Sequence, residues 1–216
     1  MDNGTDEGSA PATQLIGANY APCDFDQKHT SSVSFNYQLP FGKGKQFLNS
    51  GGVVNAFVGG WQLAGVETVK SGLPFTPVIN GDRANTGVGG QRPNVIGVPI
   101  VLGTVACWFY TSSNPACPSV APNTTDAFAV PAQYTYGNSG RNILRGDNLV
   151  QTDLTLMREF GISEARRLEF RAEFFNAFNH TVFANPGTSI NLSSGGQVSS
   201  TLNSARIIEL ALKFYF

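Results

Sequence analysis

ARIIELALKFYF, residues 205–216, places a large apolar side chain at every second position from Ile208 to Phe216. The positions between them hold Glu209, Ala211, Lys213 and Tyr215. A repeat of two is that of a β-strand with one apolar and one polar face. Chain ends are usually poorly ordered, so a terminal strand that closes on an aromatic residue needs an explanation from the rest of the chain.

The composition is that of a weakly charged chain. Of the 216 residues 13% are charged, about half the usual share, and the net charge is −1. Nucleic acid requires a basic surface, so we expect no nucleic-acid partner. No run of 18 apolar residues is present, which excludes a transmembrane helix. The histidines and cysteines lack zinc spacing, and we expect no metal and no cofactor.

The first residues, MDNGTDEGSAPATQ, are polar and acidic. A signal peptide has a basic segment followed by an apolar one, and this stretch has neither. We therefore expect that the chain lacks the N-terminus of its parent protein. We interpret residues 1–29 as a polar segment that ends an outer loop.

Period-two alternation recurs along the chain, and no convincing amphipathic helix appears. The predicted strands lie near 30–41, 53–78, 152–160, 167–180 and 205–216. The second strand is interrupted by Gly59 and Gly60, which predict a bulge or a bend. In the fourth strand, charged and apolar side chains alternate without a break from Arg167 to Phe174.

The connections between these strands alternate in length. Those at 42–52 and 161–166 are short, whereas those at 79–150 and 181–204 are long. Outer-membrane barrels have short periplasmic turns and long outer loops. The last strand, at roughly 3.3 Å per residue and a tilt near 45°, rises about 28 Å, enough for an apolar band of about 25 Å.

The predicted fold class is therefore all-β. We expect an antiparallel meander of about five long strands, an incomplete segment of a transmembrane β-barrel with long outer loops. Because even the smallest spanning barrels need about eight strands, we expect an open, twisted sheet. On this interpretation residues 30–216 form the C-terminal part of the barrel.

The alternation assigns each strand a lipid-facing and a lumen-facing side. The lipid-facing candidates are Leu168, Phe170, Phe174, Leu210, Leu212 and Phe214. The lumen-facing candidates are Arg167, Glu169, Arg171, Glu173, Glu209 and Lys213. Arg158 interrupts the apolar face, and we expect it to snorkel toward the periplasmic headgroups or to be turned inward by a bulge.

The aromatic residues fit the two girdles that flank the apolar band of a barrel. With the C-terminus taken as periplasmic, one group falls near the periplasmic rim: Phe41, Trp61, Phe160, Phe214 and Phe216. A second group falls near the outer rim: Phe75, Phe174 and Phe178. The same orientation places 79–150 and 181–204 outside the cell.

Six motifs resemble the C-terminal part of TonB-dependent, Oar-like outer-membrane receptors, in matching order and spacing. They are DFDQKH (24–29), YQLPFGKGK (37–45), GGWQLAGVETVKSGLPFTP (59–77), GNSGRNILRGD (137–147), LEFRAEFFNAFNH (168–180) and the terminal ELALKFYF. The resemblance implies uptake or binding of a large ligand, such as an oligosaccharide, a peptide or a metal chelate. It implies a barrel of about 22 strands with an N-terminal plug, of which this chain would be a C-terminal fragment.

The resemblance also implies the partners of the chain. These are outer-membrane lipid, the barrel assembly machinery, the plug and remaining barrel strands of the parent, and the TonB system through the region outside this chain. The terminal strand resembles the signal that the assembly machinery reads, with Phe214 and Phe216 as its aromatic residues.

Other chemistry finds little support in the sequence, and we expect no enzyme activity. The charges from Arg167 to Glu173 fit a polar lumen wall, where opposite charges compensate one another across strands, better than an acid–base pair. GKGK (42–45) lacks the spacing of a phosphate loop and fits a periplasmic turn. For Cys107 and Cys117, in the longest loop, a surface disulfide and two free thiols both remain open.

Two alternatives from other classes remain. A soluble carbohydrate-binding sandwich would pack its apolar faces against each other across a core about 10 Å thick. A surface adhesin would bind a partner through the long loop 79–150.

Overall fold

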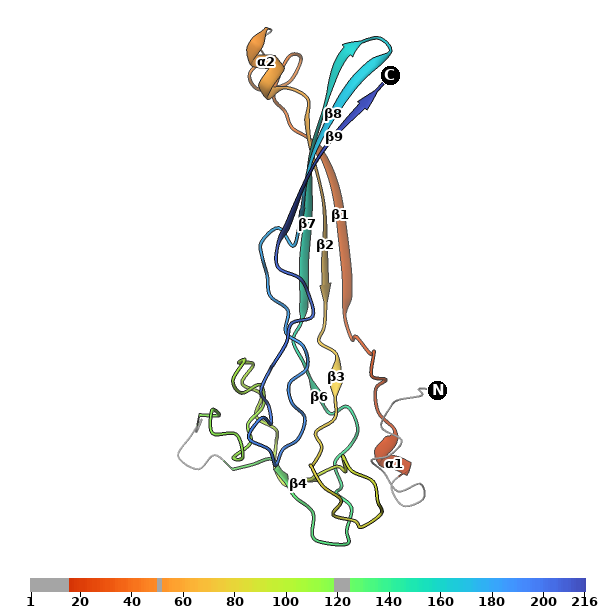
Figure 1. The fold of residues 1–216 in the computed structure, drawn as a ribbon, viewed down its shortest axis with the longest axis vertical. Helices are drawn as coiled ribbons and strands as arrows, with labels where there is room; N and C mark the ends of the chain where they lie inside the picture. Colours follow the sequence, from red (N-terminus) through yellow and green to blue (C-terminus); the bar gives the residue numbers. More distant parts are fainter. Residues whose placement is uncertain (1–15, 50–51, 119–124) are drawn as a thin grey trace. The chain divides into compact units, whose positions relative to one another are not determined.

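The computed structural model describes residues 16–49, 52–118 and 125–216 (Figure 1). The elements are α1 (Ile16–Asn19), β1 (Thr30–Gln38), α2 (Val53–Val58), β2 (Trp61–Lys70), β3 (Pro74–Phe75), β4 (Asn94–Val95), β5 (Phe128–Ala129), β6 (Leu144–Arg145), β7 (Leu149–Ser163), β8 (Arg166–Phe175) and β9 (Ile207–Tyr215). They form two compact units. The sheet unit comprises Thr30–Lys70, Leu149–Thr181 and Asn203–Phe216, and the loop unit comprises the described parts of Met1–His29, Ser71–Asn148 and Val182–Leu202.

The sheet unit is a five-stranded antiparallel sheet in the order β1-β2-β7-β8-β9. Its long strands run side by side in Figure 1, each paired with the next one in the chain that belongs to the sheet. Strands β1 and β9 form the two edges, so the sheet is open. The prediction of an all-β, antiparallel meander of about five long strands is confirmed.

The lengths of the strands follow from the alternation in the sequence. Strand β7 has 15 residues, which at roughly 3.3 Å per residue is about 50 Å and far exceeds the usual strand of about 5–6 residues. The turn to β8 consists of Glu164 and Ala165, because β7 ends at Ser163 and β8 begins at Arg166. A β-bulge lies between Gly161 and Ser163, next to this turn.

The prediction of one long strand over 53–78 is wrong at both ends. Strand β2 ends at Lys70, and Pro74–Phe75 belong to the separate strand β3, which pairs with β6. Residues Val53–Val58 form the short helix α2, and the strand begins only at Trp61. VVNAFV lacks a polar residue at every second position, so nothing favours a two-faced strand there. Gly59 and Gly60 end the helix instead of bending a strand: Gly59 donates its N–H to Asn55 O (3.1 Å), and Gly60 has a φ of 78°.

The loop unit has its own hydrophobic core, although the sequence offered no strand pattern in 79–150. The core residues are Phe75, Ile79, Trp108, Phe109, Ala127, Phe128, Leu144, Ile190 and Val198. Two short ladders, β3 with β6 and β4 with β5, bring distant segments together. Phe75 is only 5% exposed in this core, so its assignment to an outer aromatic girdle is wrong.

No helix in the described ranges is long and apolar enough to cross a membrane. Both helices are short, with 4 residues in α1 and 6 in α2.

Candidate functional site

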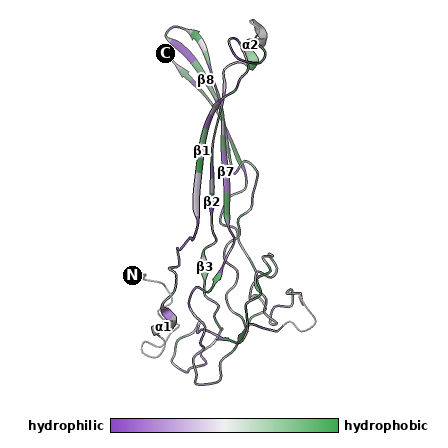
Figure 2. Cartoon of the chain, turned by 180° about the vertical axis from the view of Figure 1, so that it is seen from behind, coloured by the Kyte–Doolittle hydropathy of each residue, from purple (hydrophilic) through white to green (hydrophobic). Residues whose placement is uncertain are grey.

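One face of the sheet is apolar across neighbouring strands. The register sets Leu168 opposite Phe214, Phe170 opposite Leu212 and Phe174 opposite Ile208, while Ala172 faces Leu210. Residues directly opposite each other share a face of an antiparallel sheet, so the six predicted lipid-facing side chains lie on one side. Leu210 is 71% exposed and Leu212 is 65% exposed. Figure 2 shows hydrophobic and hydrophilic residues alternating along the long strands.

The opposite face carries the charged side chains. Glu169 lies opposite Lys213, and Arg167 lies opposite Tyr215. The guanidinium of Arg167 lies over the Tyr215 ring, 4.4 Å from its centroid, and the Tyr215 hydroxyl donates to Glu169 Oε2 (3.0 Å). These contacts link β8 and β9 on the polar face, in addition to the backbone ladder between the two strands.

Arg171 compensates the carboxylates beside it on β8. Its Nε lies 3.4 Å from Glu169 Oε1, and its Nη1 lies 3.6 Å from Glu173 Oε1. This arrangement offsets the repulsion between Glu173 and Glu209, which the register sets directly opposite each other. The six predicted lumen-facing residues therefore share one polar, ion-paired face.

Arg158 stays on the apolar face. The register sets it opposite Trp61 on one side and Phe170 on the other, and the bulge of β7 lies beyond it. Its guanidinium lies 4.3 Å from the Phe160 ring centroid and 5.6 Å from that of Trp61. Contacts of this kind stabilise a desolvated cation by about 2 kcal/mol. The predicted inward turn by a bulge is therefore wrong.

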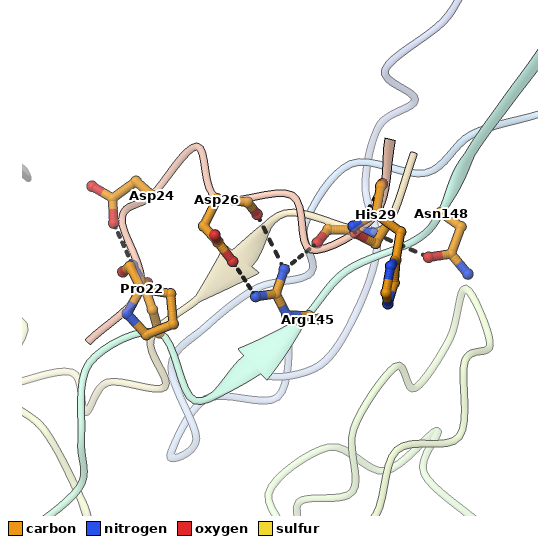
Figure 3. Close-up of polar contacts among 9 residues, drawn as sticks. Pro22, Asp24, Asp26, His29, Arg145 and Asn148 are labelled. Atoms are coloured by element: carbon orange, nitrogen blue, oxygen red, sulfur yellow. Dashed lines mark hydrogen bonds and ion pairs between the residues drawn. The ribbon is translucent and has the colours of Figure 1, made fainter. Parts of the chain in front are cut away.

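The loop unit joins three segments that are far apart in sequence through two aspartate–arginine pairs. Arg141 Nη2 lies 2.6 Å from Asp24 Oδ1, and Arg145 pairs with Asp26. Arg145 Nη1 also donates to Asp26 O (3.1 Å) and to Gly72 O (3.0 Å). Figure 3 shows Arg145 pointing toward Asp26.

This junction brings residues of the motifs DFDQKH, SGLPFTP and RNILRGD into contact. Asn142 Nδ2 donates to Asp24 Oδ1 (2.7 Å) and to Pro22 O (2.8 Å). Pro74 of β3 pairs with Arg145 of β6. Of the polar segment 1–29, residues 1–15 lie outside the described residues, and residues 22–29 pack within the loop unit. Sequence reasoning missed both ion pairs, although two aspartates and two arginines recur within short motifs.

Asp82 organises a loop of the same unit. Its Oδ2 accepts from the Gly87 N–H (2.6 Å), and its Oδ1 accepts from Gln91 Nε2 (2.6 Å). Hydrogen bonding from the backbone of Thr86 is the largest cause that lowers the pKa of the Asp82 carboxyl below its ordinary value. In the described ranges no three His, Cys, Asp or Glu side chains gather closely enough to hold a metal ion.

Cys107 and Cys117 form a disulfide, while Cys23 carries a free thiol. Cys107 is fully buried and precedes the core residues Trp108 and Phe109. The bond therefore holds the 107–117 loop against the core of the loop unit.

Replacing both Cys107 and Cys117 by serine is expected to lower the free energy of unfolding of the loop unit by about 2–4 kcal/mol, because the unfolded chain regains loop entropy. Denaturation followed by Trp108 fluorescence measures the loss. Cys23→Ser is the matched control and is expected to leave the midpoint unchanged. Equal midpoints for the double variant and the control would contradict a structural role for this disulfide.

Comparison with known families finds a match over most of the chain. A family model described as "Outer membrane beta barrel domain" matches residues 1–209, nearly the whole chain. No curated protein and no solved structure matches the chain. The two-faced antiparallel sheet is the architecture that this description requires. The chain belongs to the outer membrane beta barrel domain family, and its location is the outer membrane.

Proposed function

We propose that the chain supplies the C-terminal five strands of a TonB-dependent, Oar-like receptor that binds or takes up a large ligand. Oligosaccharides, peptides and metal chelates are the ligand classes that such a receptor suits. The observation that carries the proposal is the five-stranded antiparallel sheet, with an exposed apolar face on one side and an ion-paired polar face on the other.

In this role the apolar face meets lipid and the polar face lines the lumen. Soluble monomers rarely expose apolar patches of more than a few hundred Å², and this face runs from Leu154 of β7 across β8 to Phe214 of β9. A carbohydrate-binding sandwich would cover it with a second sheet. In the described ranges the other sheets have only two-residue strands.

The open edges of the sheet also fit this role. Unpaired edge strands tend to pair with further chains, and a barrel removes both edges by closure. Strand β1 would pair with the preceding strand of the barrel, and β9 with its first strand. The terminal aromatics Phe214 and Phe216, whose ring centroids lie 6.1 Å apart, would be presented to the assembly machinery.

The long connections support an outer position for the loop unit. Lys70 lies opposite Leu149, and Phe175 lies opposite Ile207. Both long connections therefore leave from the same end of the sheet, whereas the β7–β8 turn lies at the other end. A folded core closed by a disulfide suits an oxidising compartment outside the inner membrane.

The test is ligand accumulation in three strains of the source bacterium: wild type, a strain without this gene, and a strain without TonB. Labelled oligosaccharides, peptides and ferric chelates are offered separately. One class is expected to be lost in both deletion strains, because energised uptake needs the receptor and its energy source. Loss of a class only when this gene is deleted would contradict TonB dependence, and no loss at all would contradict uptake.

A further inference from the structure

We infer that the β1–β2 connection, together with Arg158, forms a membrane-interface site that binds the phosphate of anionic phospholipid headgroups. We call this connection, residues 39–49 and 52–60, the rim segment. The rim segment lies at the Trp61 end of β2, opposite to the end of the sheet from which the long connections leave. Its placement in the periplasmic leaflet rests on the proposed function.

The rim segment exposes aromatic and aliphatic side chains that its own packing does not use. Phe57 is 73% exposed, and Phe47 and Leu48 are each at least half exposed. Trp61, which follows the segment, donates its indole N–H to Phe57 O (2.9 Å). Aromatic residues with one polar end are enriched where a protein crosses from hydrocarbon to headgroups. Trp61 therefore suits the headgroup boundary, and the exposed apolar side chains beside it suit the adjoining hydrocarbon.

The charge of the rim segment is entirely positive. It contains Lys43 and Lys45 and has no aspartate or glutamate. The Lys43 N–H donates to Asn55 Oδ1 (2.6 Å), which holds the turn against α2. Cations without carboxylates beside exposed apolar residues complement a layer of lipid phosphates.

Arg158 adds a buried cation next to the rim segment. Its Nη2 donates to Asn55 O (3.3 Å), so it contacts the residue that also holds the Lys43 turn. Its Nε and Nη1 are buried and have no hydrogen-bond partner among the described residues. On this face of the sheet the nearest carboxylate along β2 is that of Glu67, six residues from Trp61. Among the residues that the structure describes, none forms a salt bridge with Arg158, Lys43 or Lys45.

The apolar surroundings indicate a lipid headgroup rather than a free phosphate ion. A soluble anion would require only the cations and would leave Phe47, Leu48 and Phe57 in water. The rim also continues the apolar face of the sheet, since Arg158 lies in register between Trp61 and Phe170. A phospholipid would contact both the cations and the apolar side chains, with its phosphate near the cations and its acyl chains along the apolar face.

The experiment uses the protein purified from the outer membrane and reconstituted in dioleoyl phosphatidylcholine vesicles. Trp61 fluorescence, isolated as the signal that Trp61→Phe removes, is titrated with dibrominated phosphatidylglycerol or dibrominated phosphatidylcholine as quencher. We expect a relative binding constant roughly fivefold or more in favour of phosphatidylglycerol, since each lysine or arginine near an anionic surface contributes about that factor.

The variant Lys43→Gln/Lys45→Gln is expected to reduce this preference toward equality. The matched control Lys28→Gln/Lys70→Gln removes the same charge away from the rim segment, and we expect it to keep the preference. A preference that survives the rim variant, or that inorganic phosphate abolishes, would overturn the lipid site. Equal quenching by both lipids would overturn the site alone, whereas no quenching by either would also contradict the proposed membrane role.

Discussion

Leu210→Arg is expected to destabilise the protein in a bilayer by about 2–4 kcal/mol, the cost of an arginine on the lipid face near the membrane midplane. Leu210 lies within one residue of the middle of β9 (Ile207–Tyr215) and opposite Ala172 on the apolar face. No carboxylate on this face lies opposite it. The measurement is the urea midpoint of the outer-membrane protein reconstituted in phospholipid vesicles.

Thr155→Arg is the matched control, because it places the same side chain on the polar face. Thr155 lies opposite Glu173, so the introduced cation would gain a cross-strand partner. We expect a midpoint close to that of the wild type. Equal losses in both variants would contradict the assignment of one face to lipid and the other to the lumen.

Gly72→Ala is expected to destabilise the loop unit by about 3 kcal/mol, at the upper end for overpacking of a rigid site. A Cβ at this position would overlap Gly146 O and lie 2.6 Å from Gly146 C and 2.8 Å from Asp147 O. These are backbone atoms of the junction that also contains the Arg145–Asp26 pair, so they have little freedom to move. The measurement is the rate at which an added protease cleaves the loop unit, which we expect to rise.

Gly89→Ala tests whether any glycine substitution in the loop unit has this effect. No atom lies within 4 Å of a Cβ at Gly89, and we expect cleavage at the wild-type rate. If Gly72→Ala were cleaved as slowly as this control, the close approach of Gly72 to Gly146 would be contradicted.

The sheet was predictable from sequence because its signal is local. The repeat of two in LEFRAEFF and IIELALKFY assigns each side chain to a face, and a register shift of one residue would reverse every assignment. In the observed register an apolar residue faces an apolar one, as in Leu168–Phe214, and a charged residue faces a charged one, as in Glu169–Lys213. The two faces of β8 and β9 therefore follow from patterning alone.

The loop unit was not predictable in the same way, because its contacts join residues far apart in sequence. The Asp24–Arg141 pair and the packing of Phe75 near Phe109 (ring centroids 5.9 Å apart) depend on the tertiary fold. No periodicity reports such contacts. Helix α2 was missed for another reason, because its valines and phenylalanine have high strand propensity. The glycines that flank the helix, rather than this propensity, set the start of β2 at Trp61.

The most direct test of the two-faced sheet is a cysteine scan along β9, from Ile208 to Lys213, in a Cys23→Ser background that keeps the Cys107–Cys117 disulfide. Each variant is treated in outer-membrane fragments, open on both sides, with a charged maleimide that does not enter hydrocarbon. We predict labelling at 209, 211 and 213 and protection at 208, 210 and 212. Uniform labelling along the strand, or protection at the odd positions, would contradict it.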